Sequence, residues 1–166
     1  VRPSNFSFNT ETADNNAFQN KLELFTPHQI QELALLEFNN MVSILKTKGI
    51  KVQVFDDNGS DTPDSIFPNN WFSTFTDEVI LYSMYSENRR KERKKTIYQK
   101  LSNDLRKPVN DKLVKLEKSN AILEGTGSLV CDHASKTVFA AMSPRTTPAA
   151  LEAFEKLTGY ASHRFN

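Results

Sequence analysis

Short alternating strand patterns and single helices follow one another along this chain in a repeating order. Two helices share one signature, at residues 26–49 and 147–159, where Thr-Pro begins an apolar repeat of helical spacing and a glycine ends it. A third helix is predicted over 86–107, and it ends before Pro108. The pattern predicts an α/β fold in which strand–strand–helix–strand units recur about two and a half times.

Strands are predicted for most of the apolar segments between these helices. Residues 71–75 and 78–84 form a strand pair joined at Thr76 and Asp77, and residues 50–55 alternate as a half-buried strand does. The remaining predicted strands are 2–9, 112–116, 121–132 and 136–142, and 164–166 is the possible beginning of another.

Composition sets the broad class of the protein. The 166 residues are 38% hydrophobic and 25% charged, which fits a soluble globular protein. The net charge of +1 gives no attraction to nucleic acid, and no apolar run approaches the ~20 residues of a membrane span. We therefore expect neither a nucleic-acid nor a membrane partner. A single cysteine, Cys131, suits a reducing cytoplasm.

Cysteine and histidine positions favour neither a local nucleophile nor a metal site. Cys131 ends an apolar strand and precedes Asp132, whose charge would raise the pKa of the thiol, so it is interpreted as structural. The three histidines are far apart and belong to no paired motif, so no metal or cofactor is expected. They are His28, His133 and His163.

Six basic residues occupy the seven positions from Arg89 to Lys95. A nucleic-acid surface would need aromatic or polar partners within a basic domain. The run is therefore interpreted as a solvated face of the helix at 86–107. One alternative stays open, in which one arginine of the run turns inward and binds a small carboxylate, a ligand that suits the bidentate geometry of arginine.

Three further positions have residues suited to a ligand. Glu124 follows an apolar segment and precedes two glycines within three residues, which lets a ligand approach closely. Arg145 follows an apolar strand and precedes a capped helix. Asn69 and Asn70 stand side by side before the only tryptophan, with no acid beside them. Each position is also compatible with an ordinary turn.

Four segments, in order, resemble the pentein superfamily of guanidine-modifying enzymes, which includes arginine deiminase and dimethylarginine dimethylaminohydrolase. The segments are PDSIFPNNW, NRRKER, LEGTGSLV and AMSPRTT. The chain is most similar to the citrulline-utilisation hydrolase branch, which shares the opening RP.NF.FN.ET, FPNNW and LEGTGS. This likeness extends from Arg2 to about Gly159.

The resemblance implies an α/β propeller of five strand–strand–helix–strand units around a polar channel. It also implies a cysteine that attacks an amidine or ureido carbon of a small amino-acid substrate, with a histidine and a carboxylate moving protons. By this likeness Glu124 is the catalytic acid. Arg145 binds the α-carboxylate of the substrate, and Arg90 (or Arg89) is a weaker second contact.

The family's catalytic histidine and cysteine lie further along than this sequence runs. We therefore interpret residues 1–166 as the N-terminal part of one propeller domain, inactive alone, with roughly the first two to three units. Open sheet edges would favour association, for example as a homo-oligomer. Two alternatives remain for the protein: an arginine or succinylarginine hydrolase, and a non-catalytic pentein that serves as a binding scaffold.

In arginine-processing relatives the position matching Asn70 is a carboxylate, which pairs with the guanidinium of the substrate. Asn70 carries no charge and offers both hydrogen-bond donors and an acceptor. An amide therefore suits the neutral ureido group of citrulline, and Asn69 is grouped with it as substrate-binding. The alternative is a strand-end turn in which Trp71 simply packs.

Overall fold

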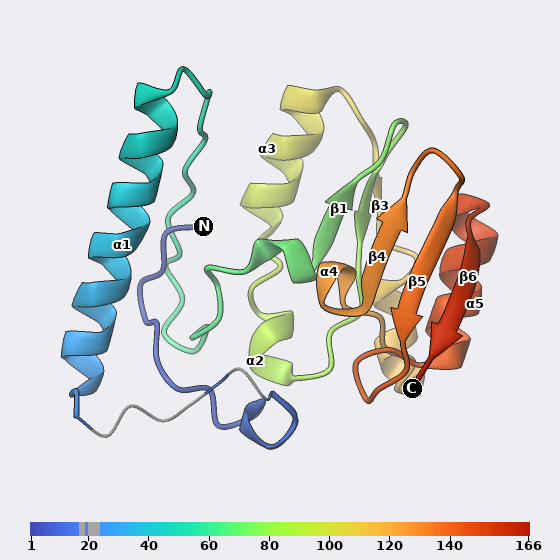
Figure 1. Cartoon of the computed structure of the whole chain (residues 1–166), viewed down its shortest axis with the longest axis horizontal. Helices are drawn as coiled ribbons and strands as arrows, with labels where there is room; N and C mark the ends of the chain where they lie inside the picture. The colour runs from blue at the N-terminus through green and yellow to red at the C-terminus, as the bar shows by residue number, and fades with distance from the viewer. Residues whose placement is uncertain (17–18, 20–23) are drawn as a thin grey trace. The chain divides into compact units, whose positions relative to one another are not determined.

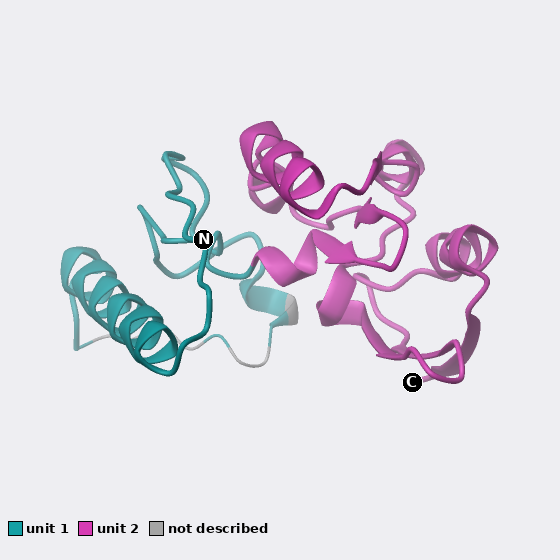
Figure 2. Ribbon diagram, turned by 90° about the horizontal axis from the view of Figure 1, so that it is seen from above, with its two compact units in different colours: residues 1–67 teal, residues 68–166 magenta. Residues whose placement is uncertain are grey.

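The computed structural model describes residues 1–16, 19 and 24–166, and the chain divides into two compact units (Figure 1). The first unit is Val1–Phe67 and the second is Pro68–Asn166, coloured separately in Figure 2. Among the described residues, no helix combines the length and hydropathy that crossing a bilayer requires. Each unit is described below by itself.

The first unit is built on one long helix, α1, which spans Pro27–Thr47. Thr26 and Gln29 form a capping box: the Thr26 hydroxyl accepts from the Gln29 amide (3.3 Å), and the Gln29 side chain accepts from the Thr26 amide (2.9 Å). The helix predicted from the Thr-Pro signature is therefore confirmed. A short 3₁₀ helix, η1, covers Ala13–Asn15. The buried side chains of α1 are Ala34, Phe38 and Val42.

The strands predicted at 2–9 and 50–55 are wrong, because these segments meet at only one isolated bridge. Arg2 pairs with Asp56 there, and no ladder continues on either side. The Gln31 side chain on α1 instead accepts from the Phe6 amide (2.5 Å) and donates to the Pro3 carbonyl (2.9 Å). Backbone groups of the N-terminal segment thus hydrogen-bond to α1, whereas in a strand they would hydrogen-bond to a neighbouring strand.

The second unit begins with a three-stranded sheet in the order β1-β2-β3. Strands β1 (Phe72–Thr74) and β2 (Val79–Leu81) are antiparallel, as predicted for this strand pair. Helix α3 (Lys95–Leu105) then leads to β3 (Val109–Asn110), which pairs parallel with β2. This is one strand–strand–helix–strand unit.

The same order recurs in the sheet β4-β5-β6 (Figure 1). Strands β4 (Leu129–Asp132) and β5 (Thr137–Ala141) are antiparallel. Helix α5 (Pro148–Thr158) leads to β6 (Ala161–Phe165), which pairs parallel with β5. The predicted recurrence of this unit is therefore confirmed for two copies within the described residues.

The single helix predicted over 86–107 is wrong, since the chain forms α2 (Glu87–Arg90) and α3 with a turn between them. The interpretation of the basic run as a solvated helix face is also wrong, because part of the run is buried. Two of its arginines turn inward to carboxylates: Arg89 pairs with Glu92 (3.0 Å) and is 3% exposed, and Arg93 pairs with Glu117. Both arginines pair with carboxylates of the chain itself, so the binding of a small carboxylate ligand by an arginine of this run stays a prediction.

Two predicted strands also take other forms. The strand predicted at 112–116 is part of a 3₁₀ helix, η3, over Val114–Ser119. The strand predicted at 121–132 is interrupted by a one-turn helix, α4 (Gly125–Ser128), before β4 begins. A third short helix, η2, spans Pro68–Asn70. These short elements form the connections in which the candidate site lies.

One hydrophobic cluster joins both strand–strand–helix–strand units, with Tyr82 after β2 stacked on Phe154 of α5 (centroids 6.3 Å apart). Thr147 precedes α5 but does not cap it with its side chain. Its hydroxyl accepts from the Ile122 amide (2.9 Å) and donates to the Ile122 carbonyl (3.2 Å), so it fixes the segment before α4 instead. The core thus holds the start of α5 and the loop before α4 together.

Candidate functional site

The candidate site residues lie in equivalent loops of the two strand–strand–helix–strand units. Because the first two strands of each unit are antiparallel, the loop before the first strand and the loop after the second lie at one end of the sheet. In the first unit these loops carry Asn70 and Tyr85. In the second unit they carry Glu124 and Arg145.

Glu124 is buried, with 1% of its surface exposed, at the N-terminus of α4. One carboxylate oxygen, Oε1, accepts from the backbone amide of Tyr85 (2.9 Å). The other, Oε2, lies 3.5 Å from Nη1 of Arg145. Among the described residues no hydrogen-bond donor reaches Oε2. The carboxylate is therefore held in place at one oxygen and retains acceptor capacity at the other.

The backbone also ties Glu124 to Arg145. The Glu124 amide donates to the Arg145 carbonyl (3.2 Å) and to the Ser128 hydroxyl (2.9 Å). That hydroxyl donates in turn to the Arg145 carbonyl (2.7 Å). The structure thus brings together two of the sequence-predicted site residues, and Ser128, which sequence reasoning missed, closes the contact.

Arg90 lies on the other side of Tyr85. Its Nε donates to the Met84 carbonyl (2.9 Å), and its Nη2 donates to the Tyr85 carbonyl (3.2 Å). The Tyr85 peptide groups therefore contact both Arg90 and Glu124. Arg89, the other candidate of the basic run, is buried against Glu92 instead. Of the two arginines, Arg90 is the one joined to the Glu124 site.

Glu117 binds the segment that contains Met84 and Arg90, and sequence reasoning missed it. Its carboxylate accepts from the Met84 amide (2.7 Å), pairs with Arg93 (2.7 Å) and lies 3.6 Å from Nε of Arg90. Two glutamates thus accept from two successive amides, Glu117 from Met84 and Glu124 from Tyr85. No local pattern marks Glu117 in the sequence, because its partners come from distant segments.

Asn69 and Asn70 pack directly against α4. The Asn69 side chain donates to the Asn70 side-chain oxygen (3.0 Å) and to the Thr126 hydroxyl. A Cβ atom at Gly125 would overlap the Asn69 carbonyl oxygen and lie 3.0 Å from that of Asn70. One at Gly127 would lie 3.2 Å from the Asn70 side-chain nitrogen. The absence of a side chain at Gly125 and Gly127 therefore lets Asn69 and Asn70 pack against α4. The sequence did not reveal this packing.

Cys131 does not have the environment of a nucleophile. It is half-buried on β4, and burial raises the pKa of its thiol. A reactive cysteine needs the opposite shift, because the thiolate is the attacking form. His133 hydrogen-bonds the Tyr160 hydroxyl (2.6 Å), and His163 stacks on Phe139. Within the described residues no group of three or more histidine, cysteine or acidic side chains is placed to hold a metal.

The sequence model of the family described as N,N dimethylarginine dimethylhydrolase, eukaryotic, matches residues 2–166. The chain belongs to this family. It lies in the arginine-modifying branch of the pentein superfamily, as its resemblance predicted. No curated protein sequence matches the chain.

Solved structures of the same branch share the fold. The N-terminal domain of ArgZ, a cyanobacterial arginine dihydrolase, bound to substrate, is 18% identical with a TM-score of 0.62, over 81% of this chain and 46% of that one. A dimethylarginine dimethylaminohydrolase adduct with S-methyl-L-thiocitrulline is 16% identical (TM-score 0.61; 82% and 52%). The Pseudomonas aeruginosa enzyme complexed with citrulline is 16% identical (TM-score 0.60; 81% and 50%). The chain spans about half of each.

Proposed function

We propose that the full-length protein hydrolyses a carbon–nitrogen bond in the guanidino or ureido group of an amino acid, with citrulline as the favoured substrate. The observation that carries this proposal is the Glu124 carboxylate, which is buried, fixed by the Tyr85 amide and 3.5 Å from Arg145. A buried carboxylate oxygen without a hydrogen-bond donor is costly unless a ligand supplies one. An N–H group of a ureido or guanidino substrate is such a donor.

The charge around Glu124 suits a substrate that also carries a carboxylate. Among the described residues, Arg145 pairs with Glu124 (3.5 Å), while Arg90 and Arg93 both pair with Glu117 (3.6 and 2.7 Å) on the other side of the Tyr85 peptide. A guanidinium has five N–H donors and can bind a second acceptor beside its first. We assign the α-carboxylate of the substrate to Arg145, with Arg90 as the second contact.

Asn70 supports a neutral substrate group over a charged one. It lies against Gly127 of α4, in the helix that Glu124 precedes, and it contributes an amide where a carboxylate would pair with a guanidinium. An amide can accept from a ureido NH₂ group and donate to the ureido oxygen. The Asn69 side chain bonds Asn70 and Thr126, so we assign it the role of holding Asn70 in place.

In the proposed reaction a cysteine of the full-length protein attacks the ureido carbon and expels ammonia. Water then cleaves the thiocarbamate intermediate, which frees the cysteine thiol and a carbamic acid of ornithine, and the carbamic acid loses carbon dioxide. The overall balance is citrulline plus one water giving ornithine, ammonia and carbon dioxide. Glu124 accepts a substrate N–H hydrogen bond and favours the charge that develops on that nitrogen. We assign the nucleophile to a residue other than Cys131, because burial raises the pKa of the Cys131 thiol.

Product analysis of the full-length protein tests the proposal. The protein is incubated separately with L-citrulline, L-arginine, dimethyl-L-arginine and N-succinyl-L-arginine, and mass spectrometry measures ammonia and the amino-acid product. The proposal predicts ornithine and ammonia from citrulline at the highest kcat/KM. Faster turnover of arginine or of one of its derivatives would contradict the assignment of citrulline as the favoured substrate. Turnover of none of the four compounds would support the non-catalytic scaffold.

A further inference from the structure

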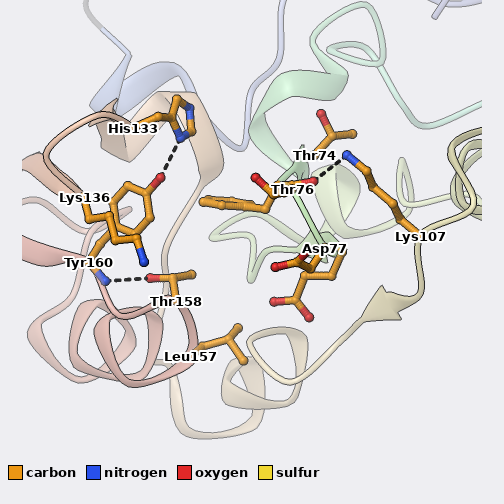
Figure 3. Close-up of a pocket in the computed structure, with 11 residues that line it drawn as sticks. Thr74, Thr76, Asp77, Lys107, His133, Lys136, Leu157, Thr158 and Tyr160 are labelled. Carbon is orange, nitrogen blue, oxygen red and sulfur yellow. Dashed lines mark hydrogen bonds between the residues drawn. The ribbon is translucent and has the colours of Figure 1, made fainter.

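A cavity opens at the end of the two sheets where the β1–β2 and β4–β5 turns lie, which is the end opposite Glu124; Figure 3 shows the residues that line it. It is about 510 Å³ in volume and lies between the β1–β2 turn, the β4–β5 turn and the connection from α5 to β6. Cavities of this size are typical of small-molecule sites. None of its lining residues belongs to the candidate site described above.

Three aromatic rings form one wall of this cavity. Phe75, His133 and Tyr160 meet edge to face, with centroid separations of 5.8 to 5.9 Å. The His133 Nδ1 and the Tyr160 hydroxyl are 2.6 Å apart, and burial raises the pKa of that hydroxyl. The wall is therefore a packed apolar surface with fixed ring orientations, which gives a ligand a defined face to lie on.

Charged groups of opposite sign flank the aromatic wall. Lys136 and Asp77 lie on opposite sides of the cavity in Figure 3. Among the described residues, neither forms a side-chain hydrogen bond or an ion pair. Other charges of the lining are already engaged: Glu78 accepts from Asn110 (2.8 Å) and Lys107 donates to the Phe75 carbonyl (2.6 Å). Lys136 and Asp77 are thus the cation and the anion of the lining whose side chains have no partner among the described residues.

The backbone at Lys136 adds a second observation. Its φ angle is 51°, in the left-handed region that glycine, asparagine and aspartate usually occupy. Its carbonyl accepts from the Ala161 amide (2.9 Å), which fixes the turn beside β6. A lysine here carries a conformational cost that glycine would avoid, and the turn that holds it is fixed by the bond to Ala161.

We propose that this cavity binds a small zwitterion of the amino-acid class. Its carboxylate would pair with Lys136, its ammonium would pair with Asp77, and its side chain would lie on the aromatic wall. A simple anion would be opposed by Asp77 and Glu78, and a simple cation by Lys136 and Lys107. Only a ligand with both charges satisfies both flanks. This site is independent of the proposed function and shares no lining residue with the Glu124 site.

Chemical-shift titration of the full-length protein tests this proposal. The ¹⁵N-labelled full-length protein is titrated with the common L-amino acids, L-ornithine and L-citrulline, each alone. We expect at least one amino acid to produce saturable shifts at the amides of Asp77, Lys136 and Tyr160. Its N-acetyl derivative and its methyl ester, which each lack one charge, should bind about tenfold more weakly or worse.

Matched variants separate this cavity from nonspecific charge effects. Lys136→Gln and Asp77→Asn should each weaken binding about tenfold, whereas Lys118→Gln, an exposed lysine outside the cavity, should leave it unchanged. The absence of saturable shifts with every amino acid would overturn the proposal. So would shifts confined to Asn70, Glu124 and Arg145, or equally tight binding of acetate. Because no catalysis is measured, failure of the proposed function would not affect the result.

Discussion

The Oε2 atom of Glu124 lies 3.5 Å from Nη1 of Arg145, although the two residues are separated by the whole of α4, β4 and β5. The backbone bond from the Glu124 amide to the Arg145 carbonyl (3.2 Å) fixes that relationship independently of the side chains. A buried acid and an arginine are thereby held at one end of the second sheet.

Replacing Glu124 with glutamine should remove activity while largely keeping the local structure. The amide oxygen of glutamine can still accept from the Tyr85 amide, but the negative charge beside Arg145 is lost. We expect kcat of the full-length protein to fall about 100-fold or more, the range for loss of one group that stabilises charge in the transition state. Steady-state kinetics measures this. Glu152→Gln, which removes an exposed partner of Arg164, is the control and should retain activity.

Glu117→Gln should raise KM more than it lowers kcat. Glu117 holds the Met84 amide and Arg93 and lies beside Arg90, so its loss frees Arg90, the second contact that we assign to the substrate carboxylate. We expect about a tenfold rise in KM, the effect of weakening one charge-assisted contact. A loss of stability with KM unchanged would give Glu117 a structural role alone. Kinetics and urea unfolding of the same preparations distinguish the two outcomes.

Gly125→Ala should destabilise the chain more than Gly127→Ala. A Cβ atom at Gly125 would overlap a fixed backbone carbonyl, whereas one at Gly127 would meet the movable Asn70 side chain. We expect the free energy of unfolding to fall by about 1–3 kcal/mol for Gly125→Ala, as for other overpacked sites, and by less for Gly127→Ala. Urea unfolding measures both. Equal losses would contradict the packing of Asn69 and Asn70 against α4.

The Cys131 thiol should react more slowly than a free cysteine, and only at higher pH. Burial raises its folded pKa above the ordinary value of 9.0, so the thiolate fraction at a given pH is smaller. By linkage, the stability that this group contributes is fully present below that ordinary value and is lost as pH rises through the raised one. Alkylation rates by iodoacetamide against pH, compared with N-acetylcysteine, test the shift. An apparent pKa from this rate–pH profile that is equal to or lower than that of N-acetylcysteine would contradict the raised pKa.

Elements that depend on local sequence signals were predicted correctly. Elements that depend on partners far away in the sequence were not. The capping box at Thr26 and Gln29 and the alternation in β1, β2 and β5 depend on neighbouring residues, so α1 and these strands were predictable. The segment 50–55 alternates just as clearly, yet it forms only the Arg2–Asp56 bridge, because no neighbouring strand extends the pairing. Pattern alone cannot supply a partner.

The site shows the same division. Glu124 and Arg145 were named from their strand-end positions and from family resemblance, and the structure places them together. Glu117 was missed because its partners, Met84 and Arg93, lie more than twenty residues away in sequence. The glycines of α4 were expected to admit a ligand, whereas they admit Asn69 and Asn70. Only the folded chain reveals which atoms fill the space beside a glycine.

Exchange of Asn70 for aspartate tests the central claim most directly, namely that an uncharged amide in the Glu124 site selects a neutral ureido substrate. The measurement is kcat/KM of the full-length protein for L-citrulline and for L-arginine, before and after Asn70→Asp. The account predicts that the unchanged protein prefers citrulline and that Asn70→Asp shifts the ratio toward arginine about tenfold or more, since the new carboxylate pairs with a guanidinium. An Asn70→Asp protein with the same citrulline preference would contradict it.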